Sequence, residues 1–380
     1  RAGFEALPAD DLPLELAIRV WGDRGRLHTE ANEREAGLRC HERASELARK
    51  LDDVNLRILT DCRLTNIVRM VQGPAAAVPM ARRVLAAAES QETSLAAKVR
   101  ALASLESSLT TLGEFDEAHR VVLRILARLD GRPDRQAGHR ARLGFILQMQ
   151  GQSEQAVQEL ERVFEQARNA GLDRVVVSAG RQLGNLLGNL GRSERAEAVY
   201  RTLLSVAERI GSQDGIFGAR LGLASSASGT DPNRAIQLYE ELRERALLVG
   251  RVREASVASL NIGIIEHGRE RLDEAEAAYR EALATIEPIG WRYVIAFTRS
   301  YLALLLDAMG RTDEARAALA EARPGARQGR RIRDAVAAAL DRDPEGVEAA
   351  LAADVPKEIA ESIRNMIAMR AQRRGPEACS

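Results

Sequence analysis

Aromatic side chains are scarce in this sequence of 380 residues: Phe, Trp and Tyr together make up 3% of the chain. Alanine and leucine dominate the apolar residues instead. The core of a β-sandwich is normally rich in aromatic and β-branched residues that alternate with polar ones, and no convincing alternating segment is present. The composition therefore argues against a β-sandwich and favours closely packed helices.

An excess of charge of either sign is also missing. Basic and acidic residues number 55 each, so the formal net charge is zero. All but three of the basic residues (Lys50, Lys98 and Lys357) are arginine, which we attribute to a GC-rich genome rather than to binding. Without a net positive charge there is no bulk electrostatic argument for nucleic acid or an anionic membrane as a partner. We therefore expect no direct binding of nucleic acid and no membrane association.

Cysteines are few and no long apolar run occurs. Cys40, Cys62 and Cys379 lie far apart without CxxC spacing, which predicts free thiols in a reducing cytoplasm. No apolar run approaches the roughly 20 residues that a membrane helix needs. The chain begins at Arg1 rather than at Met, which favours a piece of a longer polypeptide.

Motifs for catalysis or metal binding are absent as well. The sequence has no GxxxxGK[ST] phosphate loop and no GxSxG nucleophile elbow. None of the five histidines is spaced i, i+3 or i+4 from another, so a metal pair on one helix is excluded. His119 and His139 could approach each other across neighbouring repeats, but we interpret them as ordinary surface or groove histidines. We expect no catalytic residue, no metal and no cofactor.

The sequence does contain a repeat. One set of alanines recurs at a nearly constant interval along more than half of the chain. A turn signal lies about five residues before most of these alanines, and a large residue follows each alanine by four positions. The alanines are Ala118, Ala156, Ala196, Ala235, Ala275 and Ala315. Self-similarity at a period of about 40 residues is the mark of a solenoid built from stacked units.

The unit at 173–211 shows what each repeat contains. Its first half carries leucines at i, i+3, i+4 and i+7, one stripe of a helix, and Gly191 is expected to end that helix. Ser193 is expected to cap the second helix through its hydroxyl group, and Gly211 to end it. Each repeat therefore reads as helix A, turn, helix B, turn.

Small residues in these helices predict close packing. Two antiparallel helices that cross at about 8 Å leave little room for side chains. We expect Gly184 to face Ala196, Gly144 to face Ala156, and Tyr200 to fill the wedge against the next helix A. A single repeat cannot bury such faces alone, so the repeats must stack on one another.

This pattern resembles the tetratricopeptide repeat family. The residues that carry the resemblance are Leu183, Gly184, Leu187, Gly191, Ala196 and Tyr200 in one unit, and Gly263, Ala275, Tyr279 and Ala282 in another. The ordinary repeat of that family has about 34 residues, whereas this one has about 40 residues. Long repeats of this kind are similar to those in the sensor regions of large bacterial ATP-dependent transcription activators and in kinesin light chains. The resemblance implies an all-α, right-handed superhelical solenoid of antiparallel helix pairs, with about eight repeats and a C-terminal helical cap.

We predict three regions along the chain: degenerate N-terminal repeats at 1–92, six clear repeats at 93–322, and a divergent C-terminal helical cap with a tail at 323–380. In the first region the predicted helices are 12–25, ended by Gly22 or Gly25, and then 30–51, 53–72 and 75–89. The clear repeats are 93–130, 134–170, 173–210, 213–249, 252–288 and 291–322. The cap is expected to contain helices at 331–341, 344–353 and 356–371.

The resemblance also implies that helices A line a concave surface. Arg142, Arg181 and Arg220 recur there at equal spacing, and Asn261 continues the row. The other polar residues expected near this row are Arg100, Asn185, Asn189 and His267. Such a row would suit an acidic peptide, a terminal carboxylate or a ligand that bears phosphate. The alternative is that these arginines form salt bridges between repeats.

Four functions follow as hypotheses. The first is a non-catalytic solenoid that binds a protein or peptide, as the sensor or scaffold region of a bacterial regulatory protein. The second is the effector-binding region of a transcription regulator, with a small molecule or a peptide as its ligand. The third is an enzyme with its active site in the groove. The fourth is assembly into a homo-oligomer through exposed end repeats.

Overall fold

A computed structural model describes the chain except for residues 1–11, 32, 323–326, 353–354, 356 and 375–380. All regular structure in this described part is helical, and no strand occurs there. The chain divides into two compact units, residues 1–175 and 176–380. The predicted all-α class is therefore confirmed, whereas the predicted region boundaries at 92 and 322 stay a prediction.

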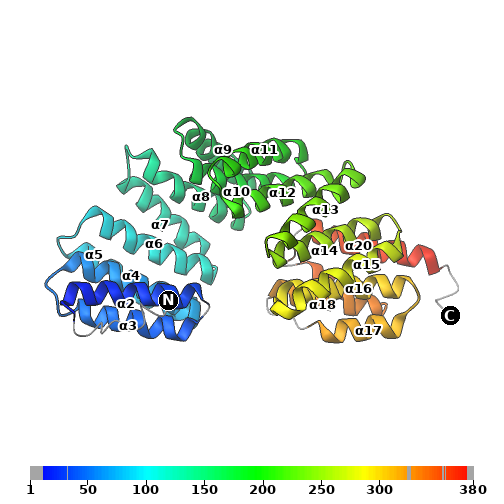
Figure 1. Ribbon diagram of the computed structural model, residues 1–380, viewed down its shortest axis with the longest axis horizontal. Helices are drawn as coiled ribbons and strands as arrows, with labels where there is room; N and C mark the ends of the chain where they lie inside the picture. The colour runs from blue at the N-terminus through cyan, green and yellow to red at the C-terminus, as the bar shows by residue number, and fades with distance from the viewer. Residues whose placement is uncertain (1–11, 32, 323–326, 353–354, 356, 375–380) are drawn as a thin grey trace. The chain divides into compact units, whose positions relative to one another are not determined.

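Helices follow one another in pairs, each pair a helix A and a helix B (Figure 1). The first unit contains α2 (Leu14–Glu30), α3 (Arg34–Ala48), α4 (Val54–Val71), α5 (Pro74–Ser90), α6 (Leu95–Leu112), α7 (Phe115–Arg128), α8 (Pro133–Met149) and α9 (Ser153–Asn169). Within this unit each helix packs against the next in sequence.

The second unit begins within α10 and continues the same alternation. Its helices are α10 (Asp173–Asn189), α11 (Ser193–Arg209), α12 (Gln213–Ala227), α13 (Pro232–Leu248), α14 (Val252–Gly268), α15 (Leu272–Ile286), the short 3-10 helix η2 (Glu287–Ile289), α16 (Arg292–Ala308) and α17 (Thr312–Glu321). Three further helices follow the last pair: α18 (Arg327–Leu340), α19 (Pro344–Leu351) and α20 (Lys357–Arg374). The helices predicted for the cap are therefore present within a few residues of their expected bounds.

The repeating alanines occupy equivalent sites. All six are 0% exposed, each on a helix B that contacts the helix A of its own repeat. Because a larger side chain would push two packed helices apart, the period of the alanines reports the period of the fold.

The expected contact between glycine and alanine is wrong in detail. A Cβ atom built on Gly184 would lie 2.6 Å from Cζ of Tyr200, and one built on Gly222 would overlap the same ring. Tyr200 therefore lies between its own helix A and the next, as predicted for the wedge, and the glycines face this ring. The same arrangement joins Gly263 to Tyr279, with 2.5 Å between a built Cβ and Cδ1 of the tyrosine ring.

Some predicted helix ends also differ from the structure. Helix α2 continues past Gly22 and Gly25 because these glycines serve close packing: a Cβ on Gly25 would lie 2.7 Å from Nε2 of His41. Ser193 is the first residue of α11, and the helix has no side-chain cap. Helix α13 does have a side-chain cap, since Oδ1 of Asp231 accepts a hydrogen bond from the backbone N–H of Arg234 at 3.1 Å.

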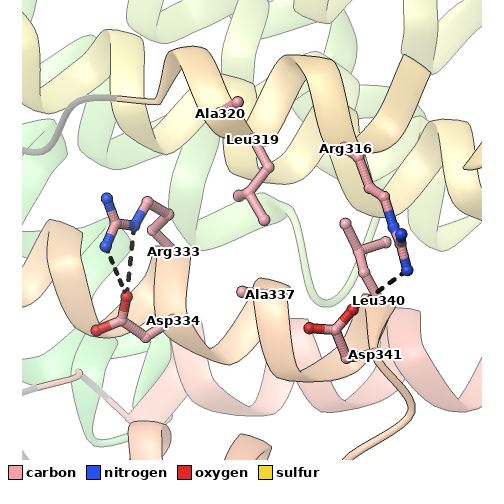
Figure 2. A pocket seen from close by; sticks show the side chains of 8 residues that line it. All are labelled: Arg316, Leu319, Ala320, Arg333, Asp334, Ala337, Leu340 and Asp341. Atoms are coloured by element: carbon pink, nitrogen blue, oxygen red, sulfur yellow. Dashed lines mark hydrogen bonds and ion pairs between the residues drawn. The ribbon is translucent and has the colours of Figure 1, made fainter. Parts of the chain in front are cut away.

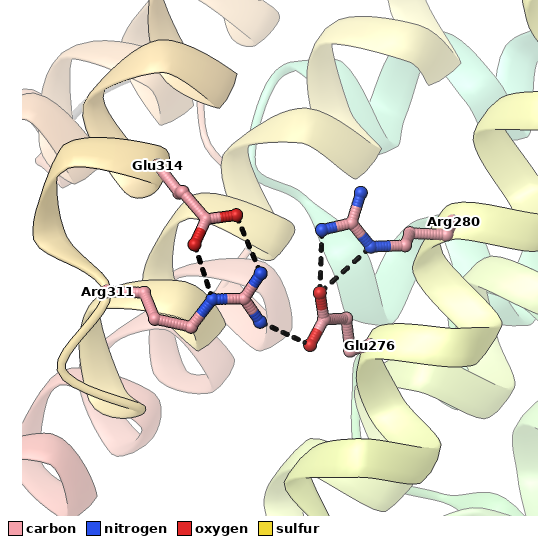
Figure 3. A network of polar contacts seen from close by, with 4 residues as sticks. All are labelled: Glu276, Arg280, Arg311 and Glu314. Carbon is pink, nitrogen blue, oxygen red and sulfur yellow. Dashed lines mark hydrogen bonds and ion pairs between the residues drawn. The ribbon is translucent and has the colours of Figure 1, made fainter.

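Many arginines join one helix B to the next. Figure 3 shows Glu276 of α15 accepting hydrogen bonds from Arg280 and, at 2.7 Å, from Arg311 at the start of α17, while Arg311 also binds Glu314. Other pairs of this kind are Arg82–Glu117 and Arg124–Glu89 in the first unit, and Arg234–Glu197 and Arg243–Glu281 in the second. Salt bridges between neighbouring repeats are therefore present on helices B. Among the arginines for which such bridges are the predicted alternative, Arg142 pairs with Glu106 of the preceding repeat.

The tyrosine contact gives a first prediction. Gly222→Ala places a methyl group against the Tyr200 ring, and overpacking of this kind costs about 1–3 kcal/mol of unfolding free energy. Gly188→Ala is the matched control, because nothing lies within 4 Å of a Cβ on that helical glycine. The control should be neutral or more stable, by up to about 1 kcal/mol. Chemical denaturation followed by circular dichroism measures both, and equal stability of the two variants would contradict the packing described.

Candidate functional site

A buried carboxylate interrupts the repeat on α6. Glu106 is 1% exposed, and it precedes Gly144 by the same interval that separates Ala118 from Ala156. It therefore occupies the repeat position that other helices A fill with a small residue: Gly144, Gly184, Gly222, Gly263 and Ala303. A carboxylate removed from water needs charged or hydrogen-bonding partners, so its surroundings are informative.

Glu106 has two polar partners. Nε of Arg142, on α8 of the next repeat, lies 2.6 Å from Oε2, and Oγ1 of Thr110 donates a hydrogen bond to Oε1 at 3.0 Å. Burial raises the pKa of Glu106, and the charge of Arg142 opposes this shift. The Arg142 side chain is still 44% exposed. The contact is an ion pair through Nε of Arg142, since Oε2 of Glu106 makes no hydrogen bond within the described chain.

Two more arginines and a histidine lie around this pair. Burial lowers the pKa of Arg69, on α4, and the nearby charge of Arg142 lowers it further, while Glu106 opposes both. Burial also lowers the pKa of His139, on α8, with Arg142 and Arg100 adding to the shift. Nη1 of Arg69 donates to Oγ1 of Thr111 at 3.2 Å.

We call Arg69, Arg100, Arg142, His139 and Glu106 the arginine surface. Its members come from α4, α6 and α8, three successive helices A of the first unit. Three guanidinium groups there outnumber one carboxylate, and Arg100 is exposed. The arrangement is suited to an anionic group that accepts hydrogen bonds from more than one arginine.

The predicted row of site residues is divided between the two units. Arg100 and Arg142 belong to the first unit and the other six residues to the second. In the second unit Arg181 is exposed on α10, and Nη2 of Arg220 lies 3.4 Å from Oε1 of Glu208. Asn185 accepts a hydrogen bond from the Tyr200 hydroxyl at 2.5 Å.

The remaining predicted residues have different surroundings. Asn189 is exposed near the end of α10, whereas the Asn261 amide donates to the backbone carbonyl of Val257 within its own helix at 2.8 Å. His267 is buried and lies edge-on to Tyr279, with 6.3 Å between the ring centroids. The side chains of Asn261 and His267 thus make contacts within their own repeat.

Sequence reasoning missed Glu106 and Arg69. The signal for Glu106 was present, because an acidic residue stood where the period calls for a small one. No signal marked Arg69, whose role depends on partners at positions 106, 111 and 142.

A cavity of about 410 Å³ lies between α17 and α18 in the second unit (Figure 2). Its apolar lining includes Leu319, Ala337 and Leu340. Its charged groups are already matched, since Arg316 pairs with Asp341 at 3.3 Å and Arg333 pairs with Asp334 at 3.0 Å. The cavity therefore offers no uncompensated charge to a ligand.

A smaller cavity, of about 280 Å³, lies among α2, α3 and α4 in the first unit. Its lining includes His41, Arg63 and Asn66. His41 is 7% exposed, and its Nδ1 atom has no hydrogen-bond partner among the described residues. Burial, with a further contribution from Arg63, lowers the pKa of His41 to about 4, so this imidazole is neutral at pH 7.

The remaining candidates for chemistry are metal-binding clusters, histidines and free thiols. No group of three or more His, Cys, Asp or Glu side chains placed to hold a metal ion occurs among the described residues. Nδ1 of His119 is hydrogen-bonded to Oε1 of Gln150 at 3.0 Å. Cys40 and Cys62 are buried free thiols, and burial raises the pKa of Cys62 to about 12, which makes it a poor nucleophile. Cys379 lies outside the described residues.

Within the described chain, every helix is too short or too polar to cross a bilayer.

Comparison with known families identifies the repeat. Residues 182–209 and 253–328 match models described as tetratricopeptide repeat. These two segments carry tetratricopeptide repeats. Both matched segments belong to the second unit, and they contain the unit with Gly184 and Tyr200 and the unit with Gly263 and Tyr279. No curated protein sequence matches the chain.

Solved structures with similar folds include a protein described as a phosphatase, a Rap protein and a signal transduction ATPase. Aspartyl phosphate phosphatase F from Bacillus subtilis has a TM-score of 0.55 at 12% identity, covering 74% of this chain and 78% of that one. A Rap protein complexed with competence and sporulation factor has a TM-score of 0.55 at 12% identity, covering 94% of this chain and 100% of that one.

The third is a signal transduction ATPase with a tetratricopeptide repeat sensor, from Pyrococcus horikoshii. Its TM-score is 0.57 at 14% identity, and the match covers 84% of this chain and 50% of that chain. At these identities the likeness concerns the fold alone, and it agrees with the stack of helix pairs that the resemblance to the tetratricopeptide repeat family implies.

The buried histidine gives a second prediction. The folded protein holds His41 neutral down to about pH 4, whereas the unfolded chain protonates it near pH 6.5. Stability should therefore fall as the pH drops from about 6.5 to about 4, with His41 contributing about 3 kcal/mol of that loss. His41→Gln should remove this part of the dependence, as measured by urea unfolding across the range. His119→Gln is the control, and equal pH dependence in both variants would contradict the prediction.

Proposed function

We propose that this chain is a non-catalytic scaffold that binds a protein or peptide, and that the arginine surface receives an acidic segment of that partner. The observation that carries the proposal is the ion pair between buried Glu106 and half-exposed Arg142. Packing alone does not explain a carboxylate at a position that other repeats fill with a small residue, because burying a charge costs free energy. A role for Glu106 as a positioning residue, which holds the Arg142 guanidinium in one orientation, does explain it.

The balance of charges at the arginine surface indicates an anionic partner. Within the arginine surface, Arg69, Arg100 and Arg142 carry three positive charges and Glu106 carries one negative charge, while Asp61 near Cys62 adds a second carboxylate beside Arg100. A partner with adjacent carboxylates, or with a phosphate group, would satisfy this excess by charge-assisted hydrogen bonds. Among partners we favour an acidic peptide, because three successive helices A supply the arginines and an extended segment can contact all three.

The descriptions of the structural neighbours support a role in regulation. One neighbour is a Rap protein solved with a peptide factor, and another carries its tetratricopeptide repeats as a sensor, according to their descriptions. We infer that this chain is the sensor or scaffold region of a cytoplasmic bacterial regulatory protein, including a regulator of transcription. A third neighbour is called a phosphatase, so aspartyl phosphate hydrolysis should be assayed beside binding; no turnover is expected.

Binding of an acidic peptide tests the proposal. A fluorescein-labelled hexaglutamate peptide is titrated with the chain at low salt and followed by fluorescence anisotropy. Replacing Arg69, Arg100 and Arg142 together by Gln should weaken binding at least about tenfold, equivalent to about 1.4 kcal/mol. The matched control replaces Arg82, Arg124 and Arg128, on helices B of the same unit, and removes the same charge. Equal weakening in both triple variants would show that only net charge matters and would overturn the assignment.

Glu106→Gln separates positioning from net charge. The substitution removes a negative charge, so electrostatics alone would strengthen binding of hexaglutamate. If Glu106 orients Arg142, binding should instead weaken by about threefold to tenfold, which is about 0.7–1.4 kcal/mol. The same anisotropy titration measures the change. A gain in affinity would reject the positioning role.

A further inference from the structure

Helices A change character towards the end of the second unit. Counted from the small residue of each repeat, Arg181 and Asn185 of α10 correspond to Ser300 and Leu304 of α16. Arg220 of α12 corresponds to Tyr301 by the same count. The α10 residues are exposed and Arg220 is half-buried, whereas the three α16 residues are fully buried. At these positions α16 is therefore buried, whereas α10 carries exposed polar side chains and α12 carries the half-buried Arg220.

The cover is the last helix of the chain. Helix α20 packs against both α16 and α14 (Figure 1). Its buried side chains Ala360, Ile363 and Met366 belong to one apolar cluster with Phe297 and Tyr301 of α16.

The opposite face of α20 is open to solvent. Glu361, Asn365 and Ala368 are exposed, and Arg364 makes a bidentate pair with Glu348 of α19 at 2.8 and 2.7 Å. Helix α20 is thus amphipathic, with its buried residues at i, i+3 and i+6. An amphipathic helix laid on an apolar surface is a general mode of helix recognition between proteins.

The reach of α20 exceeds what closing the stack requires. A solenoid needs its last pair covered by helices with a polar outer face. Helix α18 already packs against both α16 and α17, the members of that last pair. Helix α20 extends one repeat further from the end, to α14, where Leu260 and Ile264 contribute to the same cluster.

We propose that α14 and α16 form a binding surface for an amphipathic helix, and that α20 is its internal occupant. A partner protein that presents a helix with apolar residues at the spacing of Ala360, Ile363 and Met366 displaces α20 and takes its place. This inference rests on the proposed function as a binding scaffold, but it concerns another surface and another class of ligand. When α20 lies on α14 and α16, the surface is closed to a partner.

Displacement in trans tests the proposal with the unaltered chain. The probe is a synthetic peptide of residues 357–372, labelled with ¹³C and ¹⁵N so that mass spectrometry separates it from the chain. With excess peptide, amide hydrogen exchange in residues 360–369 of the chain should accelerate at least tenfold, while α14 and α16 stay protected. Unchanged exchange in α20, or faster exchange in α16 as well, would overturn the proposal.

A pair of variants provides the second measurement. Ile363→Glu with Met366→Glu releases α20 and should bind the fluorescein-labelled probe at least tenfold more tightly than the unaltered chain. Asn365→Glu with Ala368→Glu adds the same charge on the exposed face and should bind as weakly as the unaltered chain. A released variant that remains helical without gaining affinity, or that loses protection in α16, would show that α20 is part of the core. Hexaglutamate binding at the arginine surface is measured separately, so a failure of this inference can be told apart from a failure of the proposed function.

Discussion

The structure depends on one contact: a large side chain of helix B inserted between small residues of two successive helices A. Tyr200 between Gly184 and Gly222 is the clearest case. Because the ring touches its own repeat and the next, the same contact holds a pair together and joins it to its neighbour. Each repeat is then stable only in the presence of the following one, and the chain grows by addition of pairs rather than around a single core.

That contact also explains where function can be placed. The side chains that join repeats lie between helices, which leaves the outer turns of helices A free to vary. In the first unit these variable positions carry arginines around Glu106. At the end of the second unit they carry apolar residues that α20 covers. The exception at Glu106 is instructive, because a carboxylate there replaces a packing residue and gains partners from the neighbouring repeat.

The fold was predictable because one period ran through turn glycines, buried alanines and large side chains together. Local errors arose where glycine has two uses, as in α2, where Gly25 permits close approach to His41 rather than ending the helix. The site was predictable only in part. Arg142 stood out by its spacing, but its partner Glu106 departs from the period, and Arg69 is defined by non-local contacts. The position of α20 could not be derived, because its docking on α14 and α16 follows no repeat.

The ion pairs along helices B have a mechanical consequence. Arg311 between Glu276 and Glu314, and the related pairs between other helices B, connect neighbouring repeats on a side that solvent reaches. Their attraction weakens as dissolved ions screen it, whereas the tyrosine and glycine contacts do not respond in this way. Within each unit the resistance of the stack to bending therefore has two components, one that depends on ionic strength and one that does not. A rise in salt concentration makes the stack easier to bend without unfolding it.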